Sequence, residues 1–223
     1  MADITIKHLL DQALELLQDA VDRDQFDYPD LINWYNFGQR LLVGYLPDAN
    51  AVIDVMKLAS GARQSLPVRS LGLINVQRNM GTDGLTPGAA IIRSTVEAIK
   101  AFDLGWATAT QAEVIINFMQ DPADKTNFYN YPPSDGTGYV ELEFGQVPPI
   151  AVYDAGGTWE NLMVGVHEKY VDSLLNYILH RSYDKDTDFP GNLERSGYHL
   201  DLFYSSAGLQ NPGKQPAQPQ GVR

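Results

Sequence analysis

Apolar residues recur at helical spacing at the start of the chain. Between residues 3 and 22 they fall every three or four positions, which predicts one amphipathic helix. After a polar break, Asp27 followed by Pro29 is typical of a helix start, because Asp caps free amide groups and Pro fits the first turn. A second helix is therefore expected to run to about Leu46.

Between residues 51 and 150 the pattern changes to short β-like runs separated by turn residues. Val140, Leu142 and Phe144 alternate with glutamates, which predicts a half-buried strand. A short helix is expected at about 94–101. Strands are expected at 51–57, 65–66, 72–78, 89–93, 113–119, 126–131 and 139–144. Many brief strands at this spacing favour an antiparallel sandwich or an open barrel.

Helical spacing returns near residue 158. Thr158 is a suitable N-cap, and the apolar stripe that follows predicts a long helix to about Tyr183. A polar linker at 184–188 leads to a last helix that carries Leu193 and Phe203. Two helices before the β region and two after it predict one helical bundle into which the β region is inserted.

The predicted fold class is α+β, with three parts. Residues 1–50 and 158–207 form a discontinuous helical bundle, residues 51–157 form the inserted β-rich domain, and residues 208–223 form an extended arm. The arm is rich in proline and poor in apolar residues, so it cannot bury enough surface to fold alone. Two interpretations of this segment remain open: a free terminus, and an arm that becomes ordered when it binds a partner.

Composition narrows the chemistry. The chain has 223 residues, a formal net charge of −12 and no cysteine, which excludes disulfides, thiolate zinc sites and cysteine nucleophiles. The charge argues against a general nucleic-acid surface, although an acidic wall would let DNA slide past without sticking. There is no apolar run of about 18 residues and no signal-peptide pattern at the N-terminus, so we expect a soluble protein that is not exported by the usual route.

The enzyme signatures that we considered do not match. The Gly-rich turn at 81–84 lacks the lysine of a phosphate loop. His167 and His180 are thirteen residues apart, whereas two metal ligands on one helix face are four apart. Glu141 and Glu143 could form an acidic pair for glycoside hydrolysis, but they also fit solvent-facing alternation on a strand. We therefore expect no enzyme, no catalytic residue, no cofactor and no metal.

Two segments, 78–88 and 121–133, carry unusual turn chemistry. Their glycines supply positive φ, their Asp and Asn side chains fold back onto the backbone, and their prolines fix φ. Asp121 and Asp124 fit a capped turn better than a calcium loop, because Pro122 interrupts them and no 12-residue acidic loop follows. These segments are expected to shape surfaces rather than to react.

Four segments in the same order, over about residues 3–205, resemble the head-to-tail adaptor proteins of short-tailed bacteriophages. They are Tyr-Pro-Asp-Leu-Ile-Asn-Trp-Tyr-Asn-Phe-Gly-Gln-Arg at 28–40, the turn at 78–88, the run 99–106 and the segment 121–133. The resemblance implies a structural virion protein that forms a ring, commonly of twelve copies, beneath the portal. Such a ring attaches the tail nozzle and lines part of the DNA exit channel.

The resemblance also implies the partners: the portal protein, the tail nozzle, tail fibre proteins and further copies of the chain. Genomic DNA would pass through the channel without sequence-specific binding, no membrane would be involved, and the protein would reach the head–tail junction of the virion after assembly in the host cytoplasm. The expected portal-arm residues are Leu209, Pro212, Lys214, Pro216, Pro219 and Arg223, and the expected residues at subunit or tail interfaces are Tyr28, Arg78, Trp106, Trp159 and Tyr198.

Alternatives remain open at this point. Exposed aromatic side chains suit protein interfaces, but Trp and Tyr also belong to protein cores. A carbohydrate-binding β-sandwich would need an aromatic-lined groove, and a tail-associated glycan hydrolase would need convergent acids in a concave pocket.

Overall fold

The structure is a computed structural model that describes residues 4–19, 25–186 and 189–213. It confirms the α+β class, with five α-helices and two sheets in the described part. The chain divides into two compact units: a helical unit made of Met1–Leu42 and Pro148–Arg223, and a β unit made of Val43–Val147. The expected boundaries followed residues 50 and 157, and the observed ones follow Leu42 and Val147.

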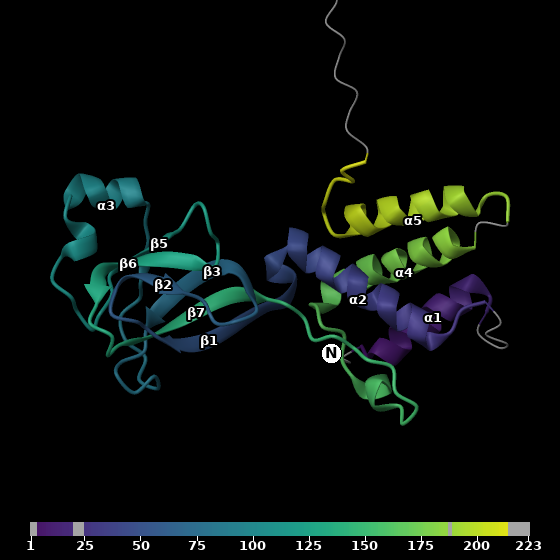
Figure 1. The fold of residues 1–223 in the computed structure, drawn as a ribbon, viewed down its shortest axis with the longest axis horizontal. Coiled ribbons are helices and arrows are strands. Elements are labelled where there is room, and N and C mark those ends of the chain that lie inside the picture. The colour runs from purple at the N-terminus through teal and green to yellow at the C-terminus, as the bar shows by residue number, and fades with distance from the viewer. Residues whose placement is uncertain (1–3, 20–24, 187–188, 214–223) are drawn as a thin grey trace, which may run out of the picture. The chain divides into compact units, whose positions relative to one another are not determined.

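The helical unit is built mainly from α1 (Ile6–Leu17), α2 (Tyr28–Tyr45), α4 (Val171–Lys185) and α5 (Asn192–Ser206). The amide of Asp30 donates to Asp27 Oδ1 at 3.0 Å, which confirms the predicted cap of α2. Leu9 and Leu10 of α1 are fully buried, because the apolar stripe of this helix faces the interior. Figure 1 shows α4 and α5 lying side by side.

The prediction of a long helix from residue 158 to about Tyr183 is wrong for the first half of that range. The chain forms short 3-10 turns at Thr158–Asn161 and Glu168–Tyr170, and α4 begins only at Val171. Between these turns the backbone pairs with the segment before α1: Ile6 N donates to Leu162 O at 2.8 Å and Val164 N donates to Ile4 O at 3.0 Å. This pairing uses the backbone carbonyl of Leu162 and the backbone amide of Val164, which a helix would need for its own hydrogen bonds. A tertiary contact therefore overrides the helix that the apolar spacing predicts.

The β unit contains two sheets. A three-stranded antiparallel sheet has the order β1-β7-β3, with β1 at Ala51–Lys57, β7 at Tyr139–Gln146 and β3 at Ser70–Asn79. A four-stranded mixed sheet has the order β2-β6-β5-β4, with β2 at Gly61–Ser65, β6 at Asn127–Ser134, β5 at Asn117–Gln120 and β4 at Ile92–Arg93. Neither sheet closes into a barrel within the described residues, and α3 (Val96–Phe102) follows β4.

Strand alternation places two cores on opposite faces of the four-stranded sheet. Leu142 and Phe144 of β7 pack with Phe118 and Phe128 in one apolar cluster, so this cluster joins the two sheets. The predicted burial of alternate β7 residues is thereby confirmed. Met119, the next residue after Phe118, belongs to a second cluster under α3. Figure 1 shows α3 on the side of this sheet away from β7.

Candidate interaction surfaces

The turn after β3 is held by one carboxylate. Asp83 Oδ1 accepts the amides of Leu85 at 2.9 Å and Thr86 at 3.0 Å, and Asp83 Oδ2 accepts the Thr86 hydroxyl at 2.8 Å. The amide of Leu85, followed by the hydroxyl and amide of Thr86, holds the pKa of Asp83 below its usual value. Gly81 and Gly84 have φ of 61° and 71°, as the predicted turn chemistry requires. The turn presents Leu85 at 80 % exposure.

A buried amide holds the base of the same turn. Asn79 Nδ2 donates to Ala89 O at 3.0 Å and to Ile115 O at 2.8 Å, while its Oδ1 accepts the amide of Ile115 at 2.9 Å. Beside it, Arg78 Nε lies 3.0 Å from Glu141 Oε2 of the neighbouring strand. Arg78 is therefore tied to its own sheet, and Glu141 is engaged in an ion pair rather than free for acid catalysis.

The second predicted turn segment is also built by carboxylate caps. Asp121 Oδ1 accepts the amide of Ala123 at 2.9 Å, and Asp124 Oδ1 accepts the amide and hydroxyl of Thr126 at 2.9 and 2.6 Å. Bonds to Thr126 lower the pKa of Asp124. These contacts are those of the predicted capped turn. In the described part of the chain, no group of three or more His, Cys, Asp or Glu residues could hold a metal ion.

Most of the aromatic residues expected at interfaces lie in the interior of the single chain. Tyr28 and Trp159 pack with ring centroids 4.8 Å apart, and the Tyr28 hydroxyl donates to Asp11 Oδ1 at 2.6 Å. Trp106 packs edge-on against Tyr129 at 5.6 Å. Tyr28, Trp106 and Trp159, which were expected at interfaces, are therefore buried in the single chain, and Trp34, Tyr35 and Tyr170 are buried as well. These large rings supply apolar area to the core.

Tyr198 is 59 % exposed, and its role at an interface stays a prediction. Among the expected portal-arm residues, Leu209 is half-buried, with its amide donating to Tyr204 O at 2.8 Å, and Pro212 is exposed. Lys214, Pro216, Pro219 and Arg223 lie outside the described residues.

Sequence reasoning missed a set of exposed apolar residues in the β unit, three in loops and turns and one at the end of α3. They are between 79 % and 91 % exposed, and we call Val68, Leu85, Phe102 and Leu104 the tip residues. A signal existed for two of them: Val68 follows Pro67, and Leu85 follows Gly84, so each apolar side chain sits inside turn chemistry that cannot bury it. Exposed apolar side chains that form a contiguous patch mark contacts with other proteins, so these residues are candidates for such contacts.

The helical unit also exposes apolar side chains close to one another, and we call this set the 150–163 patch. Its members are between 45 % and 69 % exposed: Ile150, Val152, Tyr153, Leu162 and Met163. Three of them, Ile150, Leu162 and Met163, line a shared hollow of about 330 Å³. The buried Asn36 side chain fixes this segment, because it donates to Ala151 O at 2.7 Å and accepts the Ala151 amide at 2.9 Å.

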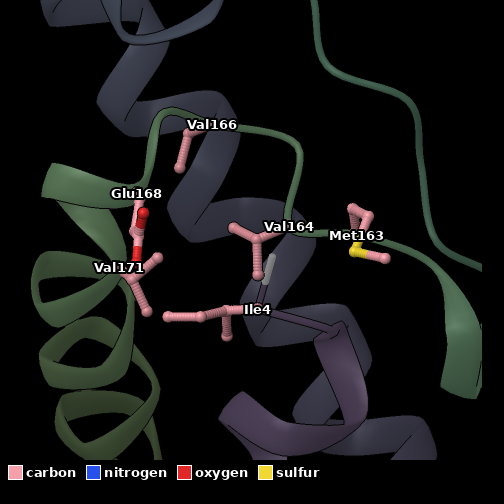
Figure 2. A pocket seen from close by; sticks show the side chains of 6 residues that line it. All are labelled: Ile4, Met163, Val164, Val166, Glu168 and Val171. Carbon is pink, nitrogen blue, oxygen red and sulfur yellow. The ribbon is translucent and has the colours of Figure 1, made fainter. Parts of the chain in front are cut away.

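A small cavity in the helical unit lies beside this patch. It has a volume of about 90 Å³ and is lined by Ile4, Met163, Val164, Val166, Glu168 and Val171. Figure 2 shows Ile4 from the N-terminal segment opposite Val164 and Val171, with Glu168 the only charged side chain among the six. Ligand pockets are generally about 300–1,000 Å³. This cavity is too small for such a ligand and brings no nucleophile next to a base.

Two histidines lie between α4 and α5. His180 Nδ1 is 2.8 Å from Ser196 Oγ, and His199 Nδ1 is 2.9 Å from Asn176 Oδ1. The ring of Tyr183 stacks on His199 with centroids 5.6 Å apart. Desolvation lowers the pKa of both histidines, because burial disfavours the charged imidazolium.

The exposed apolar side chains of the β unit and the apolar patch on the helical unit are features of the kind found where proteins contact one another. The family model described as SU10 adaptor protein matches residues 4–222, so the chain belongs to this family of phage head-to-tail adaptors. As an adaptor it belongs to the head–tail junction of the virion and contacts other virion components. Comparison with curated proteins gave no match. None of the described helices is long and apolar enough to cross a membrane.

Proposed function

We propose that this adaptor forms a closed, dodecameric ring beneath the portal of a short-tailed phage, attaches the tail nozzle and lines the DNA exit channel. The match to the adaptor family over residues 4–222 carries this proposal. A ring needs a heterologous contact that closes by rotation, in which one surface of each copy meets a different surface of the next. The role is structural, without catalysis.

We assign a different contact to each exposed surface of the chain. The 150–163 patch offers the helical unit a lateral contact between copies, because the backbone at Ala151 is fixed to Asn36 of α2 and the patch side chains are exposed in the single chain. The tip residues of the β unit offer contacts to the next tail component. The arm at 208–223 extends along the portal and, with Leu209 and Pro212, starts at the end of α5.

Charge supports the channel role. The chain carries a net charge of −12, and an acidic inner wall would repel the phosphate backbone and let DNA pass without sequence-specific binding. A neutral or basic inner face in an assembled ring would contradict this part of the proposal.

Assembly tests the ring. The chain is mixed with the portal protein of its phage, and the mass of the complex is measured by light scattering and native mass spectrometry. We expect Val152→Asp with Met163→Asp to abolish the ring, because carboxylates are placed in an apolar contact. Leu16→Asp with Phe37→Asp is the matched control, since these side chains are 56 % and 54 % exposed on α1 and α2, outside the patch. Absence of a ring with the unaltered chain, or equal loss in the control, would contradict the proposal.

Truncation tests the arm. Deleting 208–223 is expected to abolish portal binding, and deleting 214–223 alone is expected to weaken it while leaving the Asn211–Asp201 hydrogen bond of 2.8 Å in place. Unchanged portal binding by both truncated chains would exclude the arm role.

A further inference from the structure

A groove with a basic rim lies beside α3 in the β unit. It consists of two adjoining hollows of about 590 and 380 Å³. Both are lined by Val96 and Glu97 of α3 and by Asp121 and Pro122 of the capped turn. We call the combined hollow the α3 groove. Its volume is in the range of sites that hold small ligands or short peptide segments.

Positive charge is concentrated at this groove. Residues 43–147 contain seven Lys and Arg against eleven Asp and Glu, so the β unit is acidic as a whole. Four of the seven cations nevertheless line the groove: Arg63 and Lys100 the larger hollow, and Arg93 and Lys125 the smaller one. Only two carboxylates, Glu97 and Asp121, line it with them. The groove is therefore a local basic site on an acidic protein.

Two of the four cations are free to meet a ligand. Arg93 Nη2 donates to Gln120 Oε1 at 2.9 Å, and Arg63 Nη2 lies 3.9 Å from Asp121 Oδ2. Lys100 and Lys125 are exposed and form no ion pair or side-chain hydrogen bond with any described residue. One stands in each hollow, so the unpaired positive charges lie at separate parts of the groove.

Of the two carboxylates that line both hollows, the buried one, Asp121, is already engaged within the chain, whereas Glu97 is exposed. Asp121 is only 8 % exposed, and its carboxylate accepts the amide of Ala123 and, at 3.3 Å, the hydroxyl of Tyr129. With Arg63 near it, Asp121 has its charge compensated from within the chain. It therefore does not oppose an acidic ligand as a free carboxylate would.

The floor of the groove is apolar and preformed. Trp106 and Tyr129 both line the larger hollow, and their rings pack edge to face. Trp106 belongs with Ile99 and Met119 to the apolar cluster under α3, and Val96 packs against that cluster. Because these side chains are held by the core, the floor loses little freedom when a ligand binds.

We propose that the α3 groove binds an extended acidic peptide segment of the adjoining tail protein. An apolar or aromatic side chain of the segment lies over Val96 and Pro122, and carboxylates on either side pair with Lys100 and Lys125. The inference rests on the proposed function only for the source of the peptide. Nucleic acid fits less well, because the rings are packed into the floor, with Trp106 only 8 % exposed, and cannot stack with bases.

Binding to the free, full-length chain tests the groove directly. The probe is a fluorescein-labelled peptide Ser-Asp-Glu-Phe-Asp-Glu-Ser, and binding is followed by fluorescence anisotropy at low and moderate salt. We expect saturable binding that weakens as salt rises, because exposed ion pairs are screened. A peptide with Asn and Gln in place of the acids, and one with Ala in place of Phe, should each bind about tenfold more weakly.

Charge reversal locates the site. Lys100→Glu with Lys125→Glu should weaken binding by about tenfold or more, since two attractions become repulsions. The matched control is Arg40→Glu with Lys57→Glu, which makes the same change of net charge at exposed cations outside the groove and should bind as the unaltered chain does. Circular dichroism confirms that both variants are folded.

Each remaining outcome contradicts the inference. These are no saturable binding of the acidic peptide, equal loss in both charge-reversal variants, or tighter binding of a fluorescein-labelled oligothymidylate than of the peptide. Ring formation with the portal is measured in parallel on the Lys100→Glu, Lys125→Glu variant. In the unaltered chain, a ring that forms without peptide binding contradicts the groove alone, and peptide binding without a ring contradicts the proposed function alone. The variant should still form the ring while it loses the peptide.

Discussion

Replacing Asn79 by Ala should destabilise the β unit strongly. Asn79 is 4 % exposed, and its side chain is hydrogen-bonded to both backbone groups of Ile115, whose residue is 2 % exposed. Asn79→Ala leaves this buried N–H and this buried C=O without the amide partner. The Ala89 carbonyl is less affected, because it also accepts the backbone amide of Asn79 at 2.9 Å.

The magnitude follows from the two orphaned groups. A buried polar group that loses its partner costs about 1–3 kcal/mol, so the variant should lose about 3 kcal/mol of unfolding free energy. Asn75→Ala is the matched control, because Asn75 lies on the same strand, β3, but is exposed. Its loss should stay within about 0.5 kcal/mol.

Urea unfolding followed by circular dichroism measures the free energies, and hydrogen exchange of the Ile115 amide reports the local contact. We expect faster exchange at Ile115 in Asn79→Ala and unchanged exchange in Asn75→Ala. A loss below about 1 kcal/mol, or an equal loss in the two variants, would refute the conclusion that the Asn79 side chain holds the base of the turn.

Three further results are expected. Phe144→Ala, at a side chain that is 1 % exposed between the two sheets, should cost about 3–5 kcal/mol in urea unfolding, and a loss under about 1 kcal/mol would contradict its place in the core. Tyr28→Phe should cost about 1 kcal/mol by removing the hydroxyl bond to Asp11, and an unchanged midpoint would count against that bond. Burial lowers the pKa of His180 and His199; at His180 the hydrogen bond to Ser196 and the charge of Asp184 oppose this shift, and Arg181 adds to it. The unfolded chain therefore binds more protons between the lowered pKa values and the ordinary value of 6.5, so stability should fall as pH drops from 7 through 6.5. A His180→Gln, His199→Gln variant should show a smaller fall, and an identical pH profile would contradict the role of the pair.

Local turn and capping chemistry in the sequence predicted much of the fold. The Asp27 cap, the strand at 51–57 and the alternation of β7 depend on neighbouring residues alone, and each is confirmed. The helix break at 162–167 depends instead on pairing with residues 4–6, a partner far away in the chain. Helical spacing of the apolar residues contains no information about that partner, so the break could not be predicted from it.

The candidate surfaces were harder to predict, for a different reason. Aromatic residue type does not distinguish a core from an interface, because Trp and Tyr supply large apolar area to both. Trp106 and Trp159 are therefore buried, while Val68 and Leu104, which composition does not single out, are about nine-tenths exposed. The α3 groove escaped prediction because its four cations come from separate strands, a helix and a turn, which only the fold brings together.

A recurrent Asp–Thr contact explains how exposed segments keep their shape. Asp83 holds Thr86, Asp124 holds Thr126, Asp135 holds Thr137 and Asp154 holds Thr158, each through the amide and the hydroxyl of the Thr. In all four the hydrogen bonds lower the pKa of the Asp. The contribution of these contacts to stability is therefore present above the ordinary Asp pKa and is lost as pH falls through the lowered one.

Two of these turns adjoin exposed apolar side chains, Leu85 beside Asp83 and Tyr153 beside Asp154. An apolar residue on a mobile loop must lose conformational freedom when it binds, which weakens the contact. A carboxylate that holds the loop beforehand reduces this loss without covering the apolar side chain. Asp83→Ala should therefore weaken binding to the tail component and also lower the unfolding free energy by the contribution of the turn contacts. Equal binding by the variant and the unaltered chain would show that the turn is not preorganised for a partner.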